Sequence, residues 1–257
     1  PELKEYGQQI IRFIKKEGYC IVKSFPFKGY DPVAQKNLFL MLVIACGTPS
    51  DHIPGKEEYI CKVTPRKDLN RQIATYSEHD HEAPLHTDSH YRDDPEQFVA
   101  FLMEKQADFG GRNILLKSSW ILNEMKATEE GRRWLNYLKA NELPSAMPSR
   151  YSEHADEVPR PFKAPIINQS ETIIRFREDT IREGIRLAGQ RNREEEEALD
   201  FFSKLVYRSP ERRGVTLANG EILFINNHTV LHARTAFEGF SRVLLRIRFN
   251  AYPRAGD

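Results

Sequence analysis

Apolar residues recur along this chain of 257 residues with two periods, one typical of helices and one typical of strands. Ile10, Ile11, Phe13 and Ile14, for example, recur near helical spacing and predict an amphipathic helix. Four helices are expected, at residues 3–17, 31–45, 118–141 and 194–207. Short strands are expected at residues 19–22, 58–63, 98–103, 114–117, 172–176, 221–225, 230–234 and 242–249. This order favours an α+β, mainly β fold, a sandwich or jelly roll with flanking α-helices.

The strand expected at residues 242–249 has two unlike faces. Its odd-numbered residues are apolar, whereas the other face carries Arg242, Leu244, Arg246 and Arg248. Three arginines are unusual on a buried strand, and they suggest a face that lines an anion-binding cavity. The alternative is an edge strand with a solvated basic face.

A segment rich in proline interrupts the regular pattern at about residues 144–170, where five prolines occur. Long loops in compact domains are often lids or binding loops, so a lid or insertion is expected here. A surface excursion is the alternative. The length otherwise fits a single domain that spans residues 1–257.

Charge and composition narrow the class of partner. The 38 basic and 37 acidic residues give a net charge of +1, which argues against a dedicated nucleic-acid or membrane-surface binder. No apolar run approaches the roughly 18 residues of a membrane helix, and no leader segment is expected. Cys20, Cys46 and Cys61 are widely spaced and are expected to be free thiols in a cytoplasmic protein. A small-molecule substrate is the expected partner, and a homo-oligomer is compatible with the sequence.

His86 and Asp88 are the first candidate site residues. Residues i and i+2 of a strand point to the same side, so these two could hold one metal ion from a single segment. His-x-Asp alone is a weak signal, for which a surface hydrogen-bonded pair is the ordinary explanation. His232, from a distant strand, would add a second imidazole. Two imidazoles and one carboxylate, with three coordination positions left open, are typical of non-haem iron(II) oxygenases.

Two further patterns bear on this interpretation. 2-Oxoglutarate chelates iron at one end, and its far C5 carboxylate needs a cation, for which a guanidinium is a bidentate match. Arg242 follows His232 by ten residues, and Arg246 lies on the same expected strand. These residues turn a weak metal motif into a predicted iron and cosubstrate site. His79 and His81 form a second i, i+2 pair that could compete for a metal ion, but no downstream partner pattern accompanies them.

Several blocks of this sequence resemble the taurine dioxygenase and clavaminate synthase-like family of iron(II), 2-oxoglutarate-dependent oxygenases. In family order the matching blocks are Gly47-Thr48-Pro49, Pro84 to Ser89, Gly110 to Asn113, Asn227 to Phe237, and Arg242 to Arg246.

The resemblance implies a double-stranded β-helix core, the jelly-roll or cupin-like fold. It implies that His86, Asp88 and His232 bind iron(II) and that Arg242 pairs with the C5 carboxylate of 2-oxoglutarate. A threonine that helps to bind this cosubstrate in the family is replaced here by Asn113, which can still donate and accept hydrogen bonds. Family halogenases lack the metal carboxylate, so the presence of Asp88 disfavours halogenation.

The reaction implied is oxidation of an unactivated C–H bond, chiefly hydroxylation, as 2-oxoglutarate and O2 become succinate and CO2. Arg246 and Arg175 could bind an acidic group of the substrate, and His79 and His81 could accept hydrogen bonds from an amine. These residues favour a small amino-acid-like or anionic substrate. The alternatives are desaturation, cyclisation or another oxidative rearrangement at the same iron, and a cupin-like binding protein without turnover. A zinc hydrolase is a further alternative that lacks an evident general base.

Overall fold

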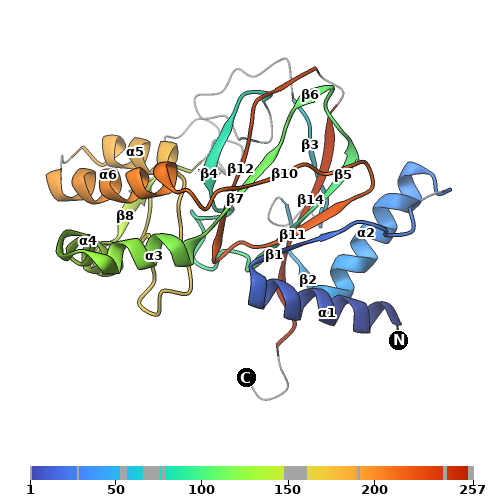
Figure 1. Cartoon of the computed structure of the whole chain (residues 1–257), viewed down its shortest axis with the longest axis horizontal. Coiled ribbons are helices and arrows are strands. Elements are labelled where there is room, and N and C mark those ends of the chain that lie inside the picture. The colour runs from blue at the N-terminus through green and yellow to red at the C-terminus, as the bar shows by residue number, and fades with distance from the viewer. Residues whose placement is uncertain are drawn as a thin grey trace.

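Two antiparallel sheets lie face to face at the centre of the computed structural model, with helices on both outer sides (Figure 1). The structure describes residues 2–27, 29–52, 57–65, 76, 79–147, 161–189, 192–239 and 242–253. Because apolar side chains from both sheets pack together between them, the arrangement matches the predicted jelly-roll core.

The larger sheet has the strand order β1-β11-β5-β14-β2, and β3 also pairs with β14. Its strands are β1 (Tyr19–Val22), β2 (Gly47–Pro49), β3 (Cys61–Val63), β5 (Phe98–Lys105), β11 (Ile222–Asn226) and β14 (Val243–Ala251). The smaller sheet has the order β10-β7-β12-β4. Its strands are β4 (Ala83–His86), β7 (Asn113–Lys117), β10 (Arg213–Val215) and β12 (Val230–Arg234). Two short strands, β6 (Phe109–Gly110) and β13 (Phe237–Glu238), pair separately.

The predicted arginine face of β14 is buried between the sheets. β14 pairs with β5 on one side and with β2 and β3 on the other, so it is not an edge strand. Arg242, just before the strand, is 1% exposed, and Arg248 is 4% exposed. The interpretation as a solvated basic face is therefore wrong, and the period of two in the sequence correctly separated the two faces.

Two helices cover the outer face of the larger sheet (Figure 1). They are α1 (Glu2–Glu17) and α2 (Pro32–Cys46). Asp31 begins α2, because its side chain accepts hydrogen bonds from the backbone N–H groups of Val33 and Ala34. Ile14 of α1 and Phe39 of α2 are both fully buried in the apolar cluster against the sheet.

Four helices form a second apolar cluster against the smaller sheet. They are α3 (Ser118–Ala127), α4 (Glu129–Ala140), α5 (Glu178–Leu187) and α6 (Arg193–Arg208). The single helix expected at residues 118–141 is wrong, because Thr128 adopts an extended conformation, φ −119° and ψ 158°, that breaks it. The Thr128 hydroxyl accepts a hydrogen bond from the backbone N–H of Gly131 and begins α4.

The strand expected at residues 172–176 is also wrong. Only one isolated bridge forms there, between Ile174 and Ile167. The segment instead runs into α5, which the sequence pattern did not predict. Its main chain is held by single hydrogen bonds to separate partners, such as Ile174 N–H to the His228 carbonyl. No continuous neighbouring strand is available to it among the described residues.

The insertion expected at residues 144–170 is flanked by paired strands, β8 (Leu143–Ser145) and β9 (Phe162–Ala164). Residues 148–160 lie outside the described residues, so the expected lid stays a prediction. The three cysteines are free thiols, as expected. Among the described helices, none has both the length and the apolar character needed to cross a membrane.

The break at Thr128 gives a stability prediction. Thr128→Ala should lower the free energy of unfolding by about 1 kcal/mol, since the cap of α4 is lost. Thr128→Ser keeps the hydroxyl and should unfold in urea at nearly the wild-type midpoint. Equal midpoints for the alanine variant and the wild type would contradict the capping role.

Candidate metal and cosubstrate site

The three predicted metal ligands meet on the inner face of the smaller sheet. In the pairing of β12 with β4, His232 lies directly opposite His86, so one register brings both imidazoles together. Nε2 of His86 lies 3.7 Å and Nε2 of His232 3.8 Å from Asp88 Oδ1. One donor atom from each residue lies within 4.8 Å of the other two, so a single ion can contact all three.

Asp88 is positioned by Asn227 rather than by a strand. β4 ends at His86, so strand periodicity does not extend to Asp88 as the sequence interpretation assumed. The buried Asn227 side chain accepts from Asp88 N–H at 2.7 Å and donates to the carbonyl oxygens of Asp88 at 3.0 Å and Glu96 at 2.9 Å. Two main-chain segments are thereby joined through one amide side chain.

The protonation of the two imidazoles suits metal binding. His86 Nδ1 lies 2.8 Å from the Pro84 carbonyl oxygen, which can only accept, so Nδ1 carries a proton and Nε2 is the nitrogen on the side of Asp88. Burial lowers the pKa of His232 to about 3, and the neighbouring His86 acts in the same direction. His232 is therefore neutral at physiological pH and available as a ligand.

The two oxygens of the Asp88 carboxylate have different neighbours. Oδ1 faces the imidazoles, while Oδ2 accepts a hydrogen bond from Arg246 Nη1 at 3.0 Å. Burial alone would raise the pKa of Asp88, but the Arg246 guanidinium and the two imidazoles outweigh it and hold the pKa well below its usual range. The carboxylate is thus ionised and oriented with one oxygen toward the ion position.

The donor set fits iron(II). Two imidazoles and one carboxylate on one side of an ion leave the remaining positions to other ligands. Among the described residues, this is the group of three or more side chains that could hold a metal ion, and the competing pair His79 and His81 does not form one.

A cavity beside His232 fits the far end of 2-oxoglutarate. Its lining includes Phe101, Asn113, Arg234, Arg242 and Leu244. Arg242 Nε and Nη2 are buried and have no hydrogen-bond partner in the described part of the chain. Burial lowers the pKa of Arg242 to about 10, and the charge of Arg234 adds to this effect. Arg242 is still a cation near pH 7, and a buried cation of this kind requires an anion.

Gly111 makes room for this arginine. It has φ +70°, and a Cβ there would lie 3.2 Å from Arg242 Nε, so a side chain would be both strained and crowded. Asn113 lines the same cavity, and its amide nitrogen lies 3.5 Å from the Val215 carbonyl oxygen. Both residues belong to the turn block noted in the sequence.

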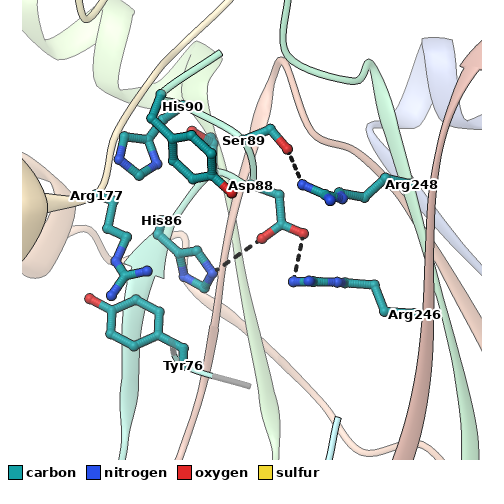
Figure 2. A pocket seen from close by; sticks show the side chains of 10 residues that line it. Tyr76, His86, Asp88, Ser89, His90, Arg177, Arg246 and Arg248 are labelled. Atoms are coloured by element: carbon teal, nitrogen blue, oxygen red, sulfur yellow. Dashed lines mark hydrogen bonds and ion pairs between the residues drawn. The ribbon is translucent and has the colours of Figure 1, made fainter. Parts of the chain in front are cut away.

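A second cavity lies beside His86 and Asp88 (Figure 2). It is lined by Tyr76, His86, Thr87, Asp88, Ser89, His90, Tyr91, Arg177, Arg246 and Arg248. Figure 2 shows Arg246 and Arg248 on one side of Asp88, and Arg177 with Tyr76 on the other side of His86. Arg248 donates to the Ser89 hydroxyl and to the His52 carbonyl oxygen, so it supports the turn that follows Asp88.

Three of the predicted substrate contacts lie elsewhere. The Arg175 guanidinium donates to the carbonyl oxygens of Arg92 and Asp93, and the residue lines neither cavity. His79 and His81 line neither cavity, and their carbonyl oxygens accept hydrogen bonds from Arg234. Arg246 lines both cavities.

Sequence reasoning missed Asn227, Tyr76, Arg177 and the part played by Arg234. Asn227 and Arg234 stand in the block that contains His232, so proximity to that ligand was an available signal. Tyr76 and Arg177 lie outside every block, and only the tertiary structure brings them to the site.

The family model described as taurine catabolism dioxygenase TauD, TfdA family matches residues 2–248. The chain belongs to the TauD/TfdA family. Membership confirms the predicted enzyme class, a non-haem iron, 2-oxoglutarate-dependent dioxygenase. No curated protein matches the sequence significantly.

Solved structures with this fold include other oxygenases. An asparagine oxygenase in complex with Fe(II), 3-hydroxyasparagine and succinate has a TM-score of 0.74 and 16% identity, covering 97% of this chain and 79% of that one. The non-haem iron oxygenase OrfP, in complex with Fe and α-ketoglutaric acid, has a TM-score of 0.68 and 14% identity, covering 98% and 80%. PvcB from Pseudomonas aeruginosa has a TM-score of 0.63 and 14% identity, covering 95% and 79%. These likenesses support the jelly-roll core of this TauD/TfdA family member.

Asn227→Ala should loosen the metal-binding candidates without removing a ligand. It leaves the buried N–H of Asp88 unsatisfied, so the free energy of unfolding should fall by about 1–3 kcal/mol. Affinity for Fe(II) or Mn(II) should fall roughly 10–100-fold, as for other supporting residues of metal sites. Titration of the ion and urea unfolding measure the two effects, with the exposed Asn123→Ala as the control. Unchanged metal affinity in a folded Asn227→Ala protein would remove Asn227 from the site.

Proposed function

We propose that this protein hydroxylates an unactivated C–H bond of a small anionic or amino-acid-like substrate, with iron(II) held by His86, Asp88 and His232. The observation that carries the proposal is Arg242, a buried cation with unpaired N–H groups beside a complete set of two imidazoles and one carboxylate. A zinc hydrolase or a binding protein gives this arginine no purpose, whereas 2-oxoglutarate supplies the missing anion.

Iron(II), bound with 2-oxoglutarate and O2, supplies the oxidising power that cleaves the C–H bond. The chain supplies geometry and charge. Arg242 and Asn113 hold the far carboxylate of 2-oxoglutarate, while Phe101 and Leu244 give the cavity an apolar wall that excludes water. Arg246 keeps Asp88 turned toward the ion through its hydrogen bond to Oδ2.

Charge supports an anionic group on the substrate. In the second cavity, Asp88 faces both Arg246 and the metal position, and Glu96, which is not among the lining residues, contacts both Arg92 and Arg248. Each carboxylate therefore serves two cations, and a carboxylate on the substrate would reduce the positive excess around Arg246. The asparagine and OrfP complexes, which contain hydroxylated amino acids, support an amino-acid-like substrate.

Location, partners and reaction outcome are also part of this proposal. The protein works in the cytoplasm, consistent with its three free thiols. Its partners are small molecules rather than nucleic acid or membranes, and a homo-oligomer is compatible with the chain. Desaturation or cyclisation at the same site is the alternative reaction, and product mass distinguishes it: hydroxylation adds one oxygen, whereas desaturation removes two hydrogens.

The direct test is anaerobic addition of Fe(II) and 2-oxoglutarate. The wild type should develop a weak visible charge-transfer band, because 2-oxoglutarate chelates the bound metal. His86→Ala should lose the band, and His81→Ala, which alters an exposed histidine outside both cavities, should keep it. A wild-type protein without the band, or a band that survives His86→Ala, would refute the proposed site.

The substrate can be sought by following succinate release across free amino acids and small carboxylates. For a substrate found in this way, Arg246→Lys should raise KM roughly tenfold or more, because lysine cannot donate to Asp88 and to the substrate with the fixed geometry of a guanidinium. The exposed Arg193→Lys should leave KM unchanged. If Arg246→Lys also leaves KM unchanged, the anionic group is bound elsewhere.

A further inference from the structure

Arg234 is a buried arginine that holds a loop by its main chain. It ends β12, is 7% exposed, and lines the cosubstrate cavity. Its Nη1 donates to the carbonyl oxygen of Tyr76 at 3.2 Å, and its Nη2 donates to that of His79 at 2.8 Å and to that of His81. One side chain thus holds three main-chain carbonyl oxygens of residues that precede β4.

Arg234 and Arg242 are neighbouring cations without a shared anion. Their guanidinium carbons lie 4.7 Å and 5.2 Å from the centre of the same Phe237 ring. Arg234 Nε, Arg242 Nε and Arg242 Nη2 are buried, and none has a hydrogen-bond partner among the residues that the structure describes. Two like charges at such a place repel each other, and a carboxylate between them would turn repulsion into two attractions.

Tyr76 is shared by the two cavities, as are His86 and Arg246. It lines both of them, and its ring contacts the His86 ring edge-on, with centroids 4.8 Å apart. The Arg177 guanidinium lies 3.9 Å from the Tyr76 ring centroid. The position of this ring therefore shapes the substrate cavity, and the main chain behind it is held by Arg234.

We infer that Arg234 is a positioning residue that shares the far carboxylate of 2-oxoglutarate with Arg242 and transmits its binding to Tyr76. When the carboxylate is bound, it occupies Arg234 Nε, while Nη1 and Nη2 keep the carbonyl oxygens of Tyr76, His79 and His81 in place. The cosubstrate thereby sets one wall of the substrate cavity. The inference rests on the proposed function, because it requires 2-oxoglutarate in this cavity.

A purely structural role for Arg234 makes a different prediction. If Arg234 only ties the segment to β12, its loss destabilises the segment whether or not 2-oxoglutarate is present. If it also binds the carboxylate, its loss weakens 2-oxoglutarate but not an analogue without that group. The two roles can be distinguished by measuring, on the same variants, the affinity for 2-oxoglutarate and the protection of the segment from hydrogen exchange.

The experiment uses the full chain loaded with Mn(II), which binds without turnover. Calorimetry gives the affinity for 2-oxoglutarate and for 2-oxopentanoate, which lacks the far carboxylate. Hydrogen exchange of the peptide spanning residues 79–86 measures how strongly its backbone amides are protected. The variants are Arg234→Met, which removes the charge, and Arg234→Lys, which keeps it with fewer donors. Arg213→Met, an exposed arginine on β10, is the matched control.

In the wild type and the control, 2-oxoglutarate should slow exchange at residues 79–86. Arg234→Met should bind 2-oxoglutarate about tenfold more weakly or worse, with 2-oxopentanoate unchanged, and its segment should show no slowing at saturating 2-oxoglutarate. Arg234→Lys should lose less affinity but should also lose protection, since one ammonium cannot hold three carbonyl oxygens as a guanidinium does.

Unchanged 2-oxoglutarate affinity in folded Arg234→Met, or full protection in Arg234→Lys, would overturn the inference. If Arg234→Met does not fold, the lysine variant decides alone, because full protection or wild-type affinity in it excludes the shared contact. Failure of the wild type to bind 2-oxoglutarate would instead refute the proposed function.

Discussion

The register between β12 and its two neighbours organises the site. Pairing with β4 sets His232 against His86, and pairing with β7 sets Arg234 against Asn113. Because side chains alternate along a strand, a slip of one residue would turn these groups to the outer face of the sheet. Leu231 and Ala233, which now pack against the outer helices, would then occupy the inner face. The backbone hydrogen bonds of β12 therefore decide which of its side chains face the site and which pack in the apolar core.

The site is a cluster of buried charges between two sheets, and each charge needs its own compensation. Main-chain carbonyl oxygens accept hydrogen bonds from the guanidinium groups of Arg234 and Arg248. Asp88 faces both Arg246 and the metal position. Arg242 has no such partner in the described chain. A buried unpaired cation opposes folding unless an anion pairs with it, so under the proposed function stability and affinity for 2-oxoglutarate are linked at this residue.

Features that follow from the spacing of residues along the chain could be predicted from the sequence. The alternation in residues 242–249 placed the arginines on one face, and the order of histidine, aspartate and histidine predicted the candidate ligands that the fold brings together. Contacts made by irregular segments were not predictable. Arg175 was chosen as a substrate contact, but Arg177 lines the cavity, because residues 172–176 form no strand and no alternation applies to them. Asn227 acts through main-chain atoms far away in sequence, which no local pattern reports.

Each sheet has its own apolar support on the outside, and a third apolar cluster fills the space between the sheets. The residues proposed to hold the ion and the cosubstrate lie along this inner layer, whereas α3 to α6 build the apolar cluster outside the smaller sheet (Figure 1). Just before α5, Phe176 nevertheless contacts Thr87 and Arg177 lines the second cavity, so the helices reach the site through their connecting segment. Directed evolution of substrate scope would therefore act on that segment, while the apolar contacts of the helices are kept.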